Sequence, residues 1–224
     1  MQREGRRDLR VQALATLAFG LTGACDAGCP LATVVEYATP QQVVAYFERR
    51  QKTVVTFVGY SGAGYENRPA MLDAAAKVID DLRPEQTIIN IGATPDGIGA
   101  VYELAKSRGF ATTGIVSTQA KRYAAELSSC VDHVFYVEDD SWGGFVDGRS
   151  ELSPTSRAMV DSSDMIIAIG GGAVARDELM GARRAGKPVR FIAADMDHRK
   201  AVDKAASKGM PPPTTFSGEA AAAF

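Results

Sequence analysis

The sequence has few cysteines, no excess of basic residues and, after residue 25, no long apolar run. Its cysteines are Cys25, Cys29 and Cys130, an odd count without the spacing of a disulfide scaffold. No second pair of Cys or His residues stands near Cys25 and Cys29, so a zinc site is not expected. We therefore expect ordinary thiols and no metal.

The charge and the hydropathy exclude two classes of partner. Lys and Arg number 25 against 27 Asp and Glu, which gives a net charge of −2 and no basic excess for a nucleic-acid partner. Residues 1–10 are basic and residues 11–25 are apolar, which is the outline of an export or lipoprotein signal. No other segment has an apolar run that approaches the length needed to span a membrane. We favour an amphipathic N-terminal helix and a cytoplasmic location, with export as the alternative.

Strand-like and helix-like segments alternate from residue 53 onward. Wholly apolar strands that alternate with helices are typical of a parallel sheet covered on both faces. The pattern predicts an α/β fold, a Rossmann-like doubly wound parallel sheet in three layers, with an N-terminal helical extension. The expected units are an extension over 1–50, a nucleotide-binding domain over 51–208 and a tail over 209–224. The expected strands are 53–59, 87–92, 111–117, 131–137, 164–170 and 188–194.

Glycines gather where three of these strands end. In such sheets ligands bind beyond the carboxyl ends of the strands, and the amides that open a helix favour an anion there. The alternative is that the glycines only make tight turns and that Asp96 caps a helix. The candidate phosphate- or nucleotide-binding residues are Gly59, Ser61, Gly62, Gly64, Gly92, Thr94, Gly97, Gly170, Gly171, Gly172, Ala173, Val174 and Ala175.

Two further side chains are candidates for the same edge of the sheet. Glu178 lies in the second turn of the helix that follows Gly172, and its side chain leans back toward the N-terminus of that helix. A carboxylate there could reach the ligand, although a solvated helix residue is the alternative. Trp142, in a glycine-containing loop, could stack on a base or pack on the domain.

The segment from Gly170 to Glu178, GGGAVARDE, resembles the Pro-Gly-Gly-x-Gly-Thr-x-x-Glu motif of the LOG family. These proteins are cytokinin-activating nucleoside 5′-monophosphate phosphoribohydrolases of the Rossmann-like SLOG superfamily. The resemblance covers residues 53–193 in order and spacing. It implies a homodimer and a catalytic role for Glu178.

The sequence departs from the family motif at several positions. Gly170 stands where the family has proline, Val174 where it has glycine and Ala175 where it has threonine. The position of the family's catalytic arginine falls on Thr155, and Arg157, two residues later, is the candidate substitute. These departures put the phosphate geometry and the catalysis in question.

The leading prediction is a nucleotide-binding protein that acts as a nucleoside 5′-monophosphate phosphoribohydrolase, with Glu178 and Arg157 as its catalytic residues. It requires no metal or redox cofactor, and its partner is a nucleotide or phosphorylated small molecule. The alternative is a non-catalytic sensor or carrier, of which the superfamily includes molybdenum-cofactor carriers. A dinucleotide-dependent oxidoreductase is less favoured, because no acidic residue ends the second strand.

Overall fold

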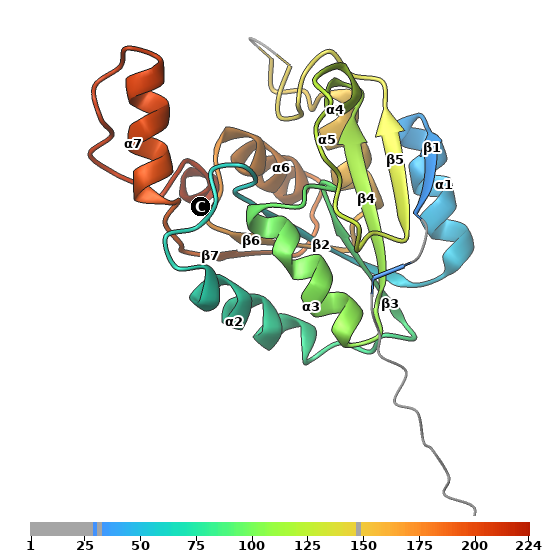
Figure 1. The fold of residues 1–224 in the computed structure, drawn as a ribbon. Helices are drawn as coiled ribbons and strands as arrows, with labels where there is room; N and C mark the ends of the chain where they lie inside the picture. The colour runs from blue at the N-terminus through green and yellow to red at the C-terminus, as the bar shows by residue number, and fades with distance from the viewer. Residues whose placement is uncertain (1–28, 31–32, 147–148) are drawn as a thin grey trace, which may run out of the picture.

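The computed structural model describes residues 29–30, 33–146 and 149–224. Within them, seven parallel strands form one sheet in the order β1-β5-β4-β3-β2-β6-β7 (Figure 1). The expected N-terminal helix over the first residues lies outside the described chain. The strands are β1 (Val34–Tyr37), β2 (Thr53–Gly59), β3 (Thr87–Ile91), β4 (Ala111–Ser117), β5 (His133–Val137), β6 (Met165–Ile169) and β7 (Val189–Ile192).

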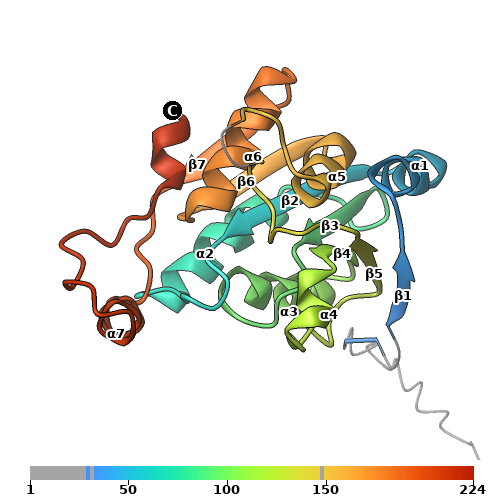
Figure 2. The same ribbon diagram turned by 90° about the horizontal axis from the view of Figure 1, so that it is seen from above.

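Helices cover both faces of the sheet, which makes the three layers visible in Figure 2. Successive side chains of β2 point to opposite faces of the sheet and pack against the helices on each face. Val55 and Phe57 pack against α2 and α3, whereas Val54 packs against α1 and α5, and Val58 against α5 and α6. The helices are α1 (Pro40–Arg50), α2 (Arg68–Ile79), α3 (Val101–Ser107), α4 (Gln119–Arg122), α5 (Pro154–Ser162), α6 (Ala173–Arg184) and α7 (His198–Ser207), with 3-10 helices η1 (Gly97–Ala100) and η2 (Ala220–Ala223).

The order of the strands confirms the predicted doubly wound α/β fold. The chain runs from β2 through β3 and β4 to β5, and then crosses back to place β6 on the other side of β2. The direction of winding therefore reverses at β2. Such a reversal opens a crevice at the carboxyl ends of the strands, where the glycine-rich turns after β2, β3 and β6 lie.

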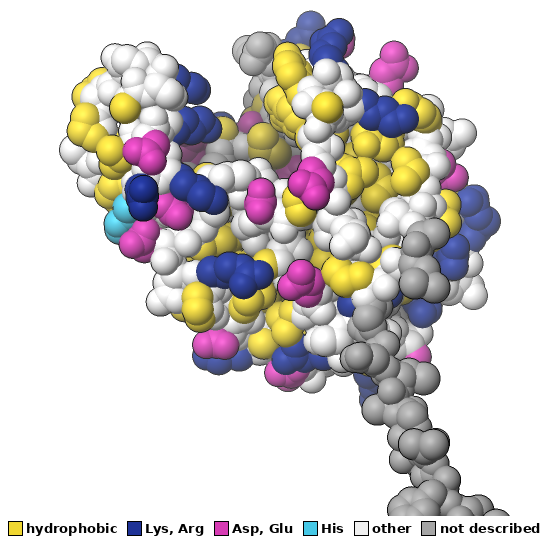
Figure 3. All heavy atoms as spheres, viewed as in Figure 1, with side chains coloured by type: hydrophobic (Ala, Val, Ile, Leu, Met, Phe, Trp, Pro, Cys, Tyr) yellow, Lys and Arg dark blue, Asp and Glu magenta, His cyan; other side chains and the backbone are white. Residues whose placement is uncertain are grey.

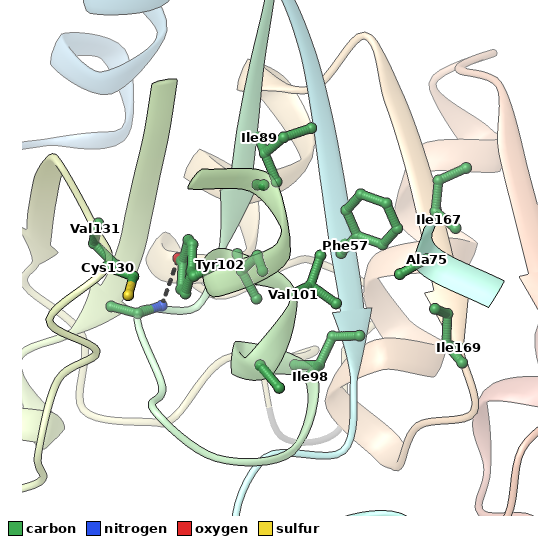
Figure 4. Packing of buried hydrophobic residues seen from close by; sticks show 14 of the residues in the cluster. Phe57, Ala75, Ile89, Ile98, Val101, Tyr102, Cys130, Val131, Ile167 and Ile169 are labelled. Carbon is green, nitrogen blue, oxygen red and sulfur yellow. Dashed lines mark hydrogen bonds between the residues drawn. The ribbon is translucent and has the colours of Figure 1, made fainter. Parts of the chain in front are cut away.

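A buried tyrosine fixes the turn after β3 to the core (Figure 4). The Tyr102 hydroxyl donates to the carbonyl of Thr113 on β4 at 2.8 Å and accepts from the amide of Ala93 at 3.2 Å. The ring packs in the same cluster as Val101 and Ile89. Because a buried hydroxyl needs partners, this residue holds the turn against β4.

The N-terminal part differs from the expected helical extension. The strand β1 was not predicted, yet it pairs with β5 in parallel register, with Val34 opposite His133. Thr39 followed by Pro40 predicts the start of a helix, and α1 begins there: Thr39 accepts from the amide of Gln42, whose side chain accepts from the amide of Thr39. Residues 34–50 therefore belong to the sheet and its covering layer.

Two other segments also differ from expectation. The sequence pattern predicts a helix over 119–128, but α4 ends at Arg122. The tail does not project from the domain, because the amides of Glu219 and Ala220 donate to the carbonyl of Gly171 and η2 packs on α6. Among the described helices, none is long and apolar enough to cross a membrane.

The expectation of ordinary thiols is wrong for two of the cysteines. Cys29 and Cys130 form a disulfide across 101 residues of sequence. Cys29 precedes β1 and Cys130 precedes β5, and these strands are neighbours in the sheet. The spacing of cysteines cannot show such a pair, because strand pairing alone brings the two together.

Candidate functional site

A cleft of about 480 Å³ lies at the carboxyl ends of β2, β3 and β4. The first turns of α5 and α6 and the loop that carries Trp142 complete its walls. The reversal of winding at β2 places these segments around one opening. The predicted site residues that line it are Gly59, Ser61, Gly62, Gly92, Thr94, Val174, Ala175 and Glu178.

The remaining predicted glycines lie close to the cleft but do not line it. Gly97 has φ +59°, and a Cβ atom there would collide with the carbonyl of Tyr60, so it serves the contact between two loops. Gly170 and Gly171 are buried, and the carbonyl of Gly171 is engaged by the C-terminal segment. The other residues outside the lining are Gly64, Gly172 and Ala173.

The N-terminus of α6 presents main-chain donors to the cleft. The first amides of a helix have no intrahelical acceptor, and no side chain caps this helix at Gly172. Val174 and Ala175, in the first turn, line the cleft. Free amides and the helix dipole together favour an anionic group at this end of the cleft.

Glu178 is the buried carboxyl of the site. It is 4% exposed, lines the cleft, and accepts a hydrogen bond at Oε1 from the Ser156 hydroxyl at 2.8 Å. Within the described chain this is the only hydrogen bond of the carboxyl, and it leaves Oε2 without one. Burial raises the pKa of Glu178 to about 7 from 4.5, opposed by the Ser156 hydrogen bond and aided by the charge of Asp177. This carboxyl can therefore exchange a proton near neutral pH.

Ser156 is a site residue that the sequence analysis missed. Its oxygen accepts from the amide of Gly144 at 2.7 Å while its proton goes to Glu178. The hydroxyl thereby joins the loop that carries Trp142 to the carboxyl of α6. The only sequence signal is a small polar residue on the buried side of α5, which many structural serines share.

The loop that carries Trp142 is hydrogen-bonded to α6. The amide of Phe145 donates to Asp177 Oδ2 at 2.8 Å. A Cβ atom on Gly143, which has φ +117°, would lie 2.8 Å from Ser156 Oγ, so a side chain there would displace the serine. Trp142 lines the cleft, is 52% exposed and stacks on Tyr123 with ring centroids 5.8 Å apart.

Arg157 is not brought together with Glu178. It pairs with Glu151 and lines a different cavity of about 780 Å³, beyond the ends of β1 and β5. Thr155, two residues earlier, lines the cleft instead. Successive helical residues are turned by about 100°, so these two point to nearly opposite sides of α5. The Thr155 hydroxyl is buried close to the Asp139 carboxylate, which accepts a hydrogen bond from the Thr155 amide at 2.9 Å.

The charged side chains that line the cleft are all acidic. They are Asp96, Glu126 and Glu178, and no Lys, Arg or His is among the described residues of the lining. Across the same residues no group of three or more His, Cys, Asp or Glu side chains is placed to hold a metal ion. Main-chain amides and hydroxyls are therefore the donors that the lining offers to an anion.

No protein-family model and no curated protein matches the sequence. Among solved structures, the molybdenum cofactor carrier protein of Chlamydomonas reinhardtii aligns with a TM-score of 0.46 at 20% identity, over 62% of this chain and 76% of its own. A second structure of that carrier gives 0.45 at 19% identity, over 77% and 94%. A structural genomics target gives 0.45 at 20% identity, over 61% and 72%.

Proposed function

We propose that the cleft binds a nucleoside 5′-monophosphate and hydrolyses its N-glycosidic bond, releasing the base and ribose 5-phosphate. One observation carries the proposal: the buried carboxyl of Glu178 has one oxygen bonded to Ser156 and the other without a partner in a cleft at the strand ends. With a pKa of about 7, this group is partly ionised at neutral pH and accepts a proton readily.

The reaction has a simple balance. The bond between C1′ and the base nitrogen breaks, its electron pair goes to the base, and positive charge develops on the ribose ring. Ionised Glu178 stabilises that charge and takes a proton from the water that attacks C1′. The departing base takes up a proton from solvent and Glu178 releases its own, so one water is consumed and no net proton. The hydroxyl of Thr155, which lines the cleft, offers a hydrogen bond to a ribose hydroxyl.

The phosphate belongs at the end of the cleft formed by Ser61 and the first turn of α6. Charge outside the lining supports this orientation. Lys200 Nζ on α7 lies 3.3 Å from the position that a Cβ atom on Gly64 would take. In Figure 3, Lys and Arg side chains gather on the flank of α7 that faces the hollow beside it.

The test combines binding and turnover. A ligand that binds only the native state raises the melting temperature, so AMP and related monophosphates should stabilise the protein. Chromatography should detect free base formed by the wild type and none formed by Glu178→Gln. Glu103→Gln, an exposed carboxylate of α3, is the matched control and should retain turnover. Failure of every monophosphate to bind would overturn the proposal.

A non-catalytic nucleotide sensor or carrier is the second candidate. It is favoured by the position of Arg157, which leaves Glu178 without a cationic partner in the cleft. Saturable binding of a monophosphate without release of base, unchanged in Glu178→Gln, would select this candidate. Light scattering of the purified chain would test the homodimer that the family resemblance implies.

The disulfide supports export over a cytoplasmic location. Disulfides persist mainly in oxidising compartments, and the bond between Cys29 and Cys130 closes a loop of 101 residues. The mass of the mature protein, measured without reduction, would report both an oxidised pair and any removal of the N-terminal segment. A cytoplasmic fraction that contains the full-length reduced chain would contradict export.

A further inference from the structure

The end of the cleft beside Trp142 combines an aromatic surface with negative charge. Trp142 stacks on Tyr123 and still exposes half of its surface. A Cβ atom on Gly143, the next residue, would lie 3.9 Å from Glu178 Oε1, so the chain beside Trp142 passes the buried carboxyl, and both side chains line one cleft. Glu126 also lines the cleft, three residues after Tyr123.

These carboxylates have no compensating cation. Among the described residues, neither Glu126 nor Glu178 forms an ion pair, and the lining contains no Lys, Arg or His. Glu178 and Thr155 both line the cleft and are each 4% exposed, and the one hydrogen bond of the Glu178 carboxyl within the described chain is to Ser156. Glu126 is exposed and solvated, so the uncompensated buried charge is that of ionised Glu178. A neutral ring would leave this charge uncompensated, whereas a cationic ring would compensate it.

The chemistry of the leaving group points the same way. A neutral base usually leaves an N-glycoside after it has gained a proton, which requires a general acid. If Glu178 takes the proton of water, no second buried acid in the described lining is left to protonate the base. A cationic ring needs no proton, because the electron pair of the broken bond neutralises its nitrogen.

We infer that the cleft takes N-glycosides of a planar, positively charged ring of the pyridinium type, with the ring on Trp142 and its charge facing Glu126 and Glu178. This inference rests on the proposed function and specifies its substrate class. Cation–π attraction and the two carboxylates act on the same ring. The products are the neutral pyridine, ribose 5-phosphate and one proton, with water as the only co-reactant.

The decisive comparison uses two ligands that differ in ring charge. Nicotinamide mononucleotide has a cationic ring, and its reduced form has a neutral one on the same ribose phosphate. Isothermal titration calorimetry should give at least about tenfold tighter binding of the cationic form, as expected for a cation on a tryptophan face near carboxylates. Because the chain has one tryptophan, quenching of its fluorescence by the cationic form reports contact at Trp142 itself.

Variants separate the sources of this preference. Glu126→Gln should reduce the preference for the cationic form severalfold, and Trp142→Leu should reduce it further. Glu103→Gln, on α3, should leave it unchanged. Equal or tighter binding of the reduced form, or of AMP, would overturn the inference and leave the proposed function standing. If none of the three monophosphates binds, both fall.

Discussion

Replacement of Glu178 by glutamine should stabilise the protein at alkaline pH while it removes the proposed catalytic group. The amide keeps an oxygen that can accept the Ser156 hydrogen bond, but it carries no charge to bury. A carboxyl with a pKa of 4.5 in the unfolded chain and about 7 in the folded protein holds its proton more tightly when folded. Wild-type stability from this group is present below pH 4.5 and is lost as the pH rises through 7.

The difference between these two pKa values corresponds to about 3 kcal/mol in the free energy of unfolding. The free energy of unfolding of Glu178→Gln should therefore be close to that of wild type near pH 4.5 and about 3 kcal/mol higher by pH 8. For a chain of this size that gain raises the melting temperature by roughly 6–12 °C.

Thermal and urea denaturation from pH 5 to pH 8.5 measure the effect. Glu103→Gln serves as the control, because an exposed carboxylate should give a difference from wild type that does not vary with pH. A difference between Glu178→Gln and wild type that is constant over this range would refute the reasoning, since it would mean that the carboxyl is not held protonated by burial.

The remaining predictions concern the pH profile, its tuning and the disulfide. The kcat/KM for hydrolysis should rise with pH to a plateau, with a midpoint near 7, because the proposed mechanism uses ionised Glu178; a profile that falls over this range would assign it the opposite role. Ser156→Ala removes the hydrogen bond that lowers the pKa of Glu178, so the midpoint should move upward. Cys130→Ser should lower the free energy of unfolding by about 2–4 kcal/mol in urea titrations, and dithiothreitol should then have no further effect.

Much of the fold could be predicted from the order of residues along the chain. The apolar run of β6, Met165–Ile169, and the glycines after it define a buried strand and its turn without any long-range information. The strand β1 was missed because its side chains are exposed and its four residues are stabilised mainly by pairing with β5. Short edge strands carry no periodic apolar signal.

Part of the candidate site could likewise be predicted from the sequence, and part could not. The glycines after β2 and β3 and the carboxyl of Glu178 were found from sequence, since strand ends and helix starts place them on one edge. Ser156 could not be found, because its role depends on contacts with Gly144 and Glu178, 12 and 22 residues away. Arg157 was chosen by charge, and the turn of α5 directs it to the other side.

The sequence by itself determined the alternation of strands and helices and the edge at which the glycines gather, because hydrophobic period and turn chemistry are local properties. Tertiary structure alone decided which side chains meet there. It buried Glu178 against Ser156, joined Cys29 to Cys130 and laid the C-terminal segment over Gly171. The physical reason is that burial, and with it the pKa of a carboxyl or the pairing of a thiol, depends on neighbours that the packing of distant segments supplies.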